Sequence, residues 1–218
     1  CWSNPLMRSA ANRPLWGWLL IGALGYLALP WYALQDGNGL AYVSQVFSNE
    51  PAGNGLLQVF AFGRSWLLCG LLGLALAGVG AAMAPGRRQG AWLLAGGALG
   101  LLGLLTSGFL IGARGWAFDS LNTDFGELGL RQGGMGWGAA VVWVALVMTA
   151  AFGLARRGYF RGDLFVAATV VFSGALLALF IVFPVLKALS GAVSTEEGRA
   201  SATALYVQCP RCVLTPMA

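Results

Sequence analysis

Five long apolar segments dominate the pattern of hydrophobic and polar positions along the chain. They cover about residues 14–34, 65–84, 91–113, 134–155 and 164–186. A helix that crosses the hydrocarbon core of a bilayer needs about 20 mostly apolar residues, and each segment has that length. None of them contains a charged side chain, as the high cost of placing a charge in lipid requires. The pattern predicts an all-α, polytopic membrane protein with five transmembrane helices.

The composition of the 218-residue chain supports this class and narrows its chemistry. Only 10% of the residues are charged and mean hydropathy is +0.72, whereas an average soluble domain carries roughly 25% charged residues. The chain has no histidine, which excludes histidine acid/base catalysis and histidine-ligated metals from it. We therefore expect no enzymatic activity, no catalytic or metal-ligating residue and no cofactor.

The basic residues predict the orientation of the helices. Seven of the 13 basic residues lie in three short segments: before the first helix, between the second and third, and between the fourth and fifth. These residues are Arg8, Arg13, Arg87, Arg88, Arg156, Arg157 and Arg161. Basic residues in short connections mark the cytoplasmic face. The N-terminus is therefore predicted to be cytoplasmic and the C-terminus extracytoplasmic.

Aromatic and proline residues support the ends of the predicted helices. An indole ring suits the headgroup region of a bilayer, and proline interrupts a helix because it lacks an amide hydrogen. Pro30 and Pro184 therefore predict helix boundaries rather than hinges. The tryptophans near predicted ends are Trp16, Trp31, Trp66, Trp92, Trp116 and Trp137.

Glycines inside the apolar segments form three pairs with a spacing of four residues. Such pairs allow close approach of helix backbones in lipid, either within one chain or across a specific dimer interface. The chain contains 33 glycines, so pairs also arise by chance, and we favour packing within the chain. The pairs are Gly96 with Gly100, Gly108 with Gly112, and Gly134 with Gly138.

The cysteines and the loops offer little chemistry. Cys69 lies in the second apolar segment, where we expect a small buried side chain. Cys209 and Cys212 form a C-x-x-C pair near the C-terminal end, and a membrane thiol oxidoreductase is one alternative that this pair raises. No strand–helix context surrounds the pair, and no second pair completes a zinc site. We expect neither thiol activity nor nucleotide binding, because no loop has the Walker spacing.

The region from residue 156 onward carries the most informative pattern. A basic link leads into an apolar helix that contains FPVL at residues 183–186, followed by the small residues SGAV at 190–193. Residues 197–201 then read EGRAS, and Tyr206 follows. This order resembles the opening helix of the permease subunits of type I ABC importers. In that family the helix begins in the cytoplasm and ends in an aromatic-Pro-apolar-apolar turn.

The preceding part of the chain resembles the additional N-terminal membrane region of long bacterial iron(III) permeases. LALPWY at residues 27–32 and GYFRGDLF at 158–165 carry this similarity. The resemblance implies a four-helix membrane region at residues 1–155 and the start of a permease domain at 156–218. The family's cytoplasmic coupling loop and its remaining core helices are missing. After about Ala204 the sequence reads YVQCPRCVLTPMA, which fits the family pattern poorly. We therefore expect the chain to be the front portion of a longer permease, either as a fragment or as the product of a disrupted reading frame.

The resemblance also implies a place and partners for the chain. The place is the bacterial inner membrane, in contact with the lipid bilayer. The partners are a cytoplasmic ATPase subunit and an extracytoplasmic substrate-binding protein, with no nucleic acid. Iron(III) as the substrate follows from the resemblance alone. The alternative is a small non-enzymatic scaffold or assembly protein that associates through its glycine-rich helix faces.

Overall fold

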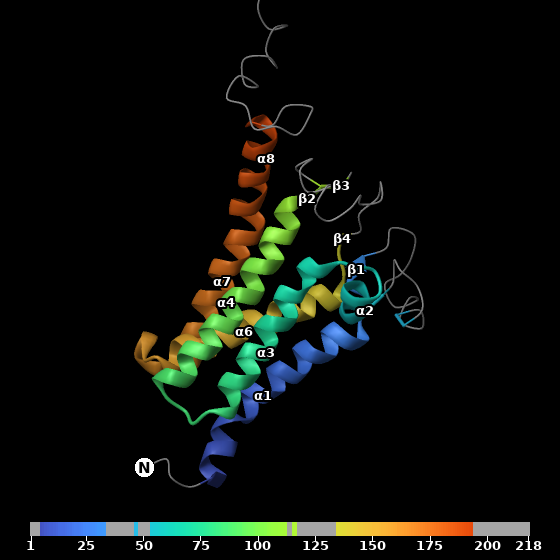
Figure 1. Cartoon of the computed structure of the whole chain (residues 1–218). Coiled ribbons are helices and arrows are strands. Elements are labelled where there is room, and N and C mark those ends of the chain that lie inside the picture. Colours follow the sequence, from blue (N-terminus) through green and yellow to red (C-terminus); the bar gives the residue numbers. More distant parts are fainter. Residues whose placement is uncertain (1–4, 34–45, 48–52, 113–114, 117–133, 194–218) are drawn as a thin grey trace, which may run out of the picture. The chain divides into compact units, whose positions relative to one another are not determined.

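The structure is a computed structural model, and it describes residues 5–33, 46–47, 53–112, 115–116 and 134–193. These residues are mostly helical (Figure 1). Four helical stretches are long and apolar enough to cross a membrane. They are Ser65–Ala82 (the 3-10 turn η2 at Ser65–Leu67 followed by α3 at Leu68–Ala82), α4 at Arg87–Leu110, α6 at Trp137–Arg156, and Leu164–Leu189.

The second and fourth predicted segments lie close to the observed helices, whereas the third is shifted toward the N-terminus. The helix α4 begins at Arg87 rather than at residue 91, so Arg87 and Arg88 lie in its first turn and not in the link. Pro85 and Gly86 stand directly before this turn, and both residue types are typical of turns that precede a helix. The helix then ends at Leu110 rather than at residue 113.

The first apolar segment forms α1 (Pro5–Ala28), which is not among the four candidate spans. The prediction of a helix to residue 34 is wrong at its C-terminal end, because Tyr32–Ala33 form the strand β1. Pro30 follows the helix end, and proline disfavours helical conformation in the residue before it. The prediction that Pro30 marks a boundary is confirmed. The helix also includes the polar residues Asn12 and Arg13, which lower its hydropathy.

The chain divides into two compact units, which we describe separately. Unit 1 comprises Cys1–Ser107 and Gly133–Ala175, and unit 2 comprises Gly108–Gln132 and Leu176–Ala218. Of the three candidate spans Ser65–Ala82, α4 and α6, α6 is the most buried. In its most apolar stretch 67% of the residues are buried, against 39% for Ser65–Ala82 and 22% for α4. The helices α1 and α3 both pack against it. The centre of unit 1 is therefore α6.

The helices of unit 1 approach one another closely through small residues. A Cβ added to Gly73 of α3 would lie 2.7 Å from the carbonyl oxygen of Gly96 in α4. A Cβ added to Gly153 of α6 would lie 2.7 Å from the amide nitrogen of Leu94, also in α4. Backbone meets backbone at both places, which is how helices associate where lipid supplies no hydrophobic drive.

The C-terminal end of α1 meets the N-terminal end of α6. The strand β1 pairs antiparallel with β4 (Gly134–Met135), with Tyr32 opposite Met135. The amide of Gly138 donates to the Pro30 carbonyl over 2.9 Å. A short helix that the apolar pattern does not predict, α2 (Gly55–Phe60), packs at the same end and contacts α1.

Trp31 belongs to this core. It is 3% exposed, and its ring lies 5.0 Å from that of Tyr26 in an edge-to-face arrangement. The interpretation of Trp31 as an anchor in the headgroup region is therefore wrong, because its indole packs on protein. Trp16 and Trp137, in contrast, are exposed.

The last helix continues through three elements: α7 (Leu164–Leu177), the π-helical turn η4 (Ala178–Val182) and α8 (Phe183–Val193). The prediction that the helix ends near Pro184 is wrong. The Phe183 amide donates to the Ala178 carbonyl, five residues earlier. This wider turn lies directly before Pro184, and a local π adjustment is one way in which a helix accommodates proline.

Unit 2 joins the C-terminal end of α4 to α8. The strands β2 (Ile111–Gly112) and β3 (Gly115–Trp116) form an antiparallel pair after α4. The rings of Phe109 and Phe183 meet edge to face with centroids 6.5 Å apart. Because the apolar helix runs on to Leu189, Lys187 lies inside it. The prediction that no charge lies inside the fifth helix therefore holds only for the shorter segment.

Candidate functional site

A cluster of polar side chains joins three helices at the arginine-rich end of unit 1. Asn12 of α1 and Gln89 of α4 are both buried, at 5% and 0% exposure. The Asn12 amide nitrogen donates to the carbonyls of Ala81 (3.0 Å) and Met83 (3.3 Å). The Gln89 amide nitrogen donates to Asn12 Oδ1 over 3.2 Å. Asn12 therefore connects α1 to the end of α3 and to the first turn of α4.

Arg156, the last residue of α6, reaches the same cluster. Its Nη2 lies 3.5 Å from Asn12 Oδ1, which places a guanidinium beside an oxygen that also accepts from Gln89. Gln89 Nε2 donates to the Met83 carbonyl as well, over 3.2 Å. The Gln89 Oε1 atom is buried and accepts no hydrogen bond from any described residue. Asn12 thus brings α1, α4 and α6 together through neutral and cationic donors.

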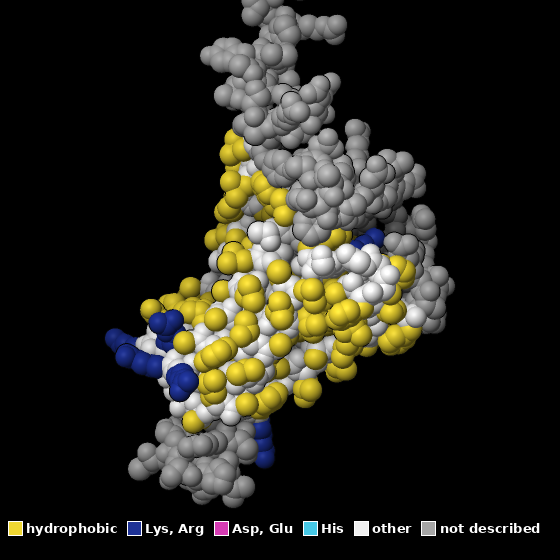
Figure 2. Space-filling model, in the orientation of Figure 1, with side chains coloured by type: hydrophobic (Ala, Val, Ile, Leu, Met, Phe, Trp, Pro, Cys, Tyr) yellow, Lys and Arg dark blue, Asp and Glu magenta, His cyan; other side chains and the backbone are white. Residues whose placement is uncertain are grey.

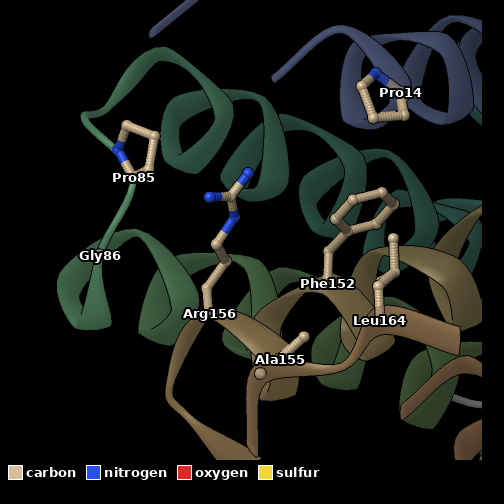
Figure 3. A pocket seen from close by; sticks show the side chains of 8 residues that line it. Pro14, Pro85, Gly86, Phe152, Ala155, Arg156 and Leu164 are labelled. Carbon is tan, nitrogen blue, oxygen red and sulfur yellow. The ribbon is translucent and has the colours of Figure 1, made fainter. Parts of the chain in front are cut away.

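A cavity of about 450 Å³ lies beside this cluster. Its lining includes Pro14 of α1, Pro85 and Gly86 before α4, Phe152 and Arg156 of α6, and Leu164 of α7. Figure 3 shows the Arg156 guanidinium pointing into the space between Pro85 on one side and Phe152 on the other. The cavity therefore combines one cationic group with apolar side chains from α1, α6 and α7.

The opposite end of unit 1 has a second polar cluster. Asn54 caps α2, because its Oδ1 accepts from the Leu57 amide over 2.9 Å, and its Nδ2 donates to the Leu27 carbonyl of α1. Arg64 donates to Gln58 Oε1 over 2.7 Å and lies 4.6 Å above the ring of Tyr32. These bonds attach the residues before α3 to the end of α1.

Lys187 makes polar contacts within unit 2. Its Nζ donates to the Phe109 carbonyl and to those of Gly108 (3.4 Å) and Ile111 (3.5 Å). The Gly108 and Phe109 carbonyls belong to the C-terminal end of α4, and Ile111 directly follows it. The end of a helix leaves unpaired acceptors and partial negative charge. Lys187 therefore caps α4 from α8, and the lysine within the apolar helix has acceptors for its charge.

The glycine pairs fall on different surfaces. Gly96 and Gly100 contact other helices of the same chain, since a Cβ on Gly96 would lie 2.6 Å from the Gly73 carbonyl and one on Gly100 would lie 2.6 Å from Leu146. Packing within the chain, the favoured interpretation, is confirmed for this pair. Gly138 contacts α1, whereas Gly134 has open space around it.

Gly108, of the pair Gly108 and Gly112, also packs within the chain. A Cβ on Gly108 would lie 3.4 Å from the ring of Phe183 within unit 2.

Cys69 is a free, half-buried thiol in α3, so the expectation of a buried side chain is only partly met. Cys209 and Cys212 lie outside the described residues, as do the EGRAS segment and Tyr206. Within the described ranges, no group of three potential ligands from His, Cys, Asp and Glu could hold a metal ion.

The polar cluster around Asn12 was not predicted from the sequence. Asn12 and Gln89 are neutral amides near the ends of apolar segments, so the distribution of charge does not indicate them. The available signal was the position of these amides, since a neutral polar residue beside an apolar segment needs a partner once it is buried. The partner could not be inferred, because the bonded residues lie 69 and 77 positions away from Asn12 in the chain.

Comparison with known proteins gives no match to a family model, a curated protein or a solved structure.

Proposed function

We propose that the chain is a five-helix membrane protein and forms the front portion of a type I ABC importer permease. The N-terminal four helices act as a membrane region ahead of the permease domain, and the helix from Leu164 opens that domain. The observation that carries the proposal is the FPVL…SGAV…EGRAS order at residues 183–201, at the end of a 26-residue apolar helix. Transport would then be driven by ATP hydrolysis on a separate cytoplasmic subunit, after delivery by a substrate-binding protein. Iron(III) is the proposed substrate by resemblance.

Contacts at both ends of α1 support its role as a fifth membrane-spanning helix. Asn12 bonds to the carbonyls that end α3, and Pro30 bonds to the start of α6. A helix rises 1.5 Å per residue, so the distance between these positions is roughly 27 Å, close to the thickness of the hydrocarbon core. The helix therefore extends between the same two levels as α3 and α6, despite its lower hydropathy.

The arginines support an orientation with the N-terminus in the cytoplasm. Arg13, Arg88 and Arg157 all lie at the end of unit 1 where α3 leads into α4 and α6 leads into α7. Short connections that are rich in arginine remain on the cytoplasmic side. The last helix then runs outward from Leu164, which is the direction that the opening helix of a permease domain requires.

The largely uncovered surface of the last helix is also consistent with a domain that continues. Only 6% of the residues in its most apolar stretch are buried, although its mean hydropathy of 2.6 is the highest of the four candidate spans. An apolar helix surface in a membrane protein faces either lipid or further helices. In the proposed permease, the missing core helices would pack on part of this surface.

Sequencing of the gene region downstream of codon 205 tests the proposal directly. We expect one of the three forward frames to encode further apolar helices and a cytoplasmic loop with the Glu-Ala-Ala…Gly pattern that docks the ATPase. The longer product, purified in mild detergent, should then retain an ATP-binding-cassette subunit. Absence of further helices in every frame would overturn the proposal, and self-association without an ATPase would favour the scaffold alternative.

A further inference from the structure

The cavity beside Arg156 lies at the level where the apolar helices of unit 1 end. Pro85 and Gly86 connect the end of α3 to the start of α4, Arg156 is the last residue of α6, and Leu164 is the first of α7. In a bilayer these positions coincide with the boundary between the hydrocarbon core and the headgroups. A group that enters the cavity from the bilayer would therefore be the headgroup of a phospholipid.

The Arg156 guanidinium is positioned by neighbours that are themselves fixed. Asn12 Oδ1 lies 3.5 Å from Arg156 Nη2, and Asn12 is bound through its amide to the Ala81 and Met83 carbonyls. The guanidinium is a planar group of N–H donors that matches the oxygens of a phosphate in a bidentate arrangement. Positioning before binding lowers the entropic cost of that contact.

The surroundings of the cavity carry an excess of positive charge. Asp163 is the only acidic residue among those that the structure describes. Its Oδ1 accepts from the amides of Phe165 (2.8 Å) and Val166 (3.3 Å) at the start of α7. In Figure 2 most of the visible dark blue side chains gather where α4 begins. The exposed arginines at this end are Arg13, Arg87, Arg88, Arg157 and Arg161.

The walls of the cavity suit the part of a lipid that adjoins its phosphate. Pro14, Phe152 and Leu164 provide apolar surface next to the guanidinium. A free inorganic phosphate gains nothing from such walls, whereas the glycerol and the first methylenes of the acyl chains do. The chemistry of the cavity is therefore amphipathic, with one cationic end and one apolar side.

We propose that the Arg156 cavity binds the headgroup of an anionic phospholipid, with Arg156 contacting the phosphate and Asn12 acting as a positioning residue. The site fixes a lipid between α1, the link from α3 to α4, the end of α6 and the start of α7, at the arginine-rich end of unit 1. This proposal does not depend on the transport function, because it rests on the cavity, on the charge around it and on the insertion of the apolar helices of unit 1 in a membrane.

Lipid binding to the purified full chain tests the site. Native mass spectrometry in detergent would give apparent Kd values for phosphatidylglycerol and for zwitterionic phosphatidylcholine. We expect Arg156→Gln to weaken phosphatidylglycerol binding roughly thirtyfold, since hydrogen bonds to a charged group contribute about 2 kcal/mol. The matched control is Arg88→Gln, which removes the same charge from an exposed position at the same end and should weaken binding no more than about fivefold.

A second variant distinguishes the contribution of the cavity to lipid binding from that of the arginine charge. Ala155→Phe keeps every arginine and places a ring in the cavity that Ala155 lines, so it should reduce phosphatidylglycerol binding while thermal unfolding without lipid stays cooperative. If Arg156→Gln prevents folding, Ala155→Phe still decides the question. Arg156→Lys retains the charge without the planar fork and should restore binding only in part.

Three outcomes would overturn the proposal. The first is an equal loss of affinity for Arg156→Gln and Arg88→Gln, which would indicate general electrostatic attraction. The second is unchanged binding in Ala155→Phe. The third is displacement of the lipid by inorganic phosphate at equal concentration, which would make free phosphate the ligand.

Discussion

Two neighbouring helices of this protein have similar hydropathy and opposite surroundings. The most apolar stretch of α6 has a mean hydropathy of 2.1, and 67% of its residues are buried. The corresponding stretch of the helix from Leu164 to Leu189 has a mean hydropathy of 2.6, and 6% of its residues are buried. In α7, Ala167 is the one buried residue, while α6 buries twelve. Hydropathy therefore indicates that a helix can enter a membrane, but not whether lipid or protein covers it.

The difference lies in the size of the side chains. Seven of the twelve buried residues of α6 are small, namely two glycines, four alanines and Thr149. The helix from Leu164 instead exposes large side chains, such as Phe165 at 80%. Small residues let backbones approach, and helix association in lipid depends on that approach. Residue size thus distinguishes the packed helix from the uncovered one.

The largest test of this comparison exchanges one glycine in each helix for leucine. A side chain at Gly153 would meet the Leu94 amide and the Gly90 carbonyl, which are backbone atoms that cannot move aside. We expect Gly153→Leu to lower the free energy of unfolding by about 3 kcal/mol or to prevent folding, as overpacking does. The matched control is Gly174→Leu in α7, where nothing lies within 4 Å. Thermal unfolding in detergent would measure both, and an equal loss would contradict the comparison.

The polar cluster at the end of α6 gives the next largest effect. Asn12→Ala leaves the Ala81 and Met83 carbonyls without their Asn12 donor and leaves the buried Gln89 amide without its Asn12 acceptor. Gln89 and Met83 keep the hydrogen bond between them, and the loss of the three bonds to Asn12 should lower the free energy of unfolding by about 2 kcal/mol. Arg13→Ala, at the adjacent exposed position, should change stability by less than about 0.5 kcal/mol. Similar unfolding midpoints for the two variants would show that the cluster does not stabilise unit 1.

A ring contact between the two helices provides a third test. Trp143 of α6 is 7% exposed, and its ring meets Phe172 of α7 edge to face at 6.1 Å. Phe172→Ala should destabilise the protein by about 1.5 kcal/mol through loss of this pair. Phe165→Ala removes an equally large side chain from an exposed position of the same helix and should be close to neutral. Equilibrium unfolding would measure both variants. A larger loss of unfolding free energy for Phe165→Ala than for Phe172→Ala would contradict the comparison.

The smallest expected effect comes from two threonines in equivalent local settings. Thr149 of α6 donates to the Ala145 carbonyl over 2.7 Å, and Thr169 of α7 donates to the Phe165 carbonyl over 2.9 Å. Thr149 is fully buried and Thr169 is exposed. Thr149→Ala should cost about 1 kcal/mol because it leaves a small void, and Thr169→Ala should be neutral. Denaturant titrations would measure the free energy of unfolding of both variants. Equal losses would contradict the difference in burial between the two threonines.

The sequence predicted the existence of the apolar helices because their length and composition are local properties. The ends were less predictable, since they depend on contacts beyond the segment. The first helix stops before Pro30, where the chain turns to pair with β4. The last helix passes Pro184 through a wider turn, although proline is the usual signal for a break.

The polar cluster and the cavity were beyond prediction for a different reason. Their residues come from α1, the link before α4, and the end of α6, so the site exists only after these elements pack. Trp31 illustrates the same limit, because its position near a helix end suits the headgroup region and Tyr26 nevertheless covers it in the core. The arginines were predictable as a set, whereas the particular role of Arg156 required the contact with Asn12.

The most direct test of the account is the side of the membrane on which each end of α1 lies. In a variant with the native cysteines replaced by serine, single cysteines would be introduced as Arg13→Cys, Arg88→Cys, Arg157→Cys and Ala61→Cys. A maleimide that cannot cross membranes would be added to intact cells. If α1 spans the membrane with its N-terminus in the cytoplasm, only the Ala61→Cys protein reacts before the membrane is permeabilised. Reaction of Arg13→Cys together with Ala61→Cys in intact cells would contradict the five-helix arrangement.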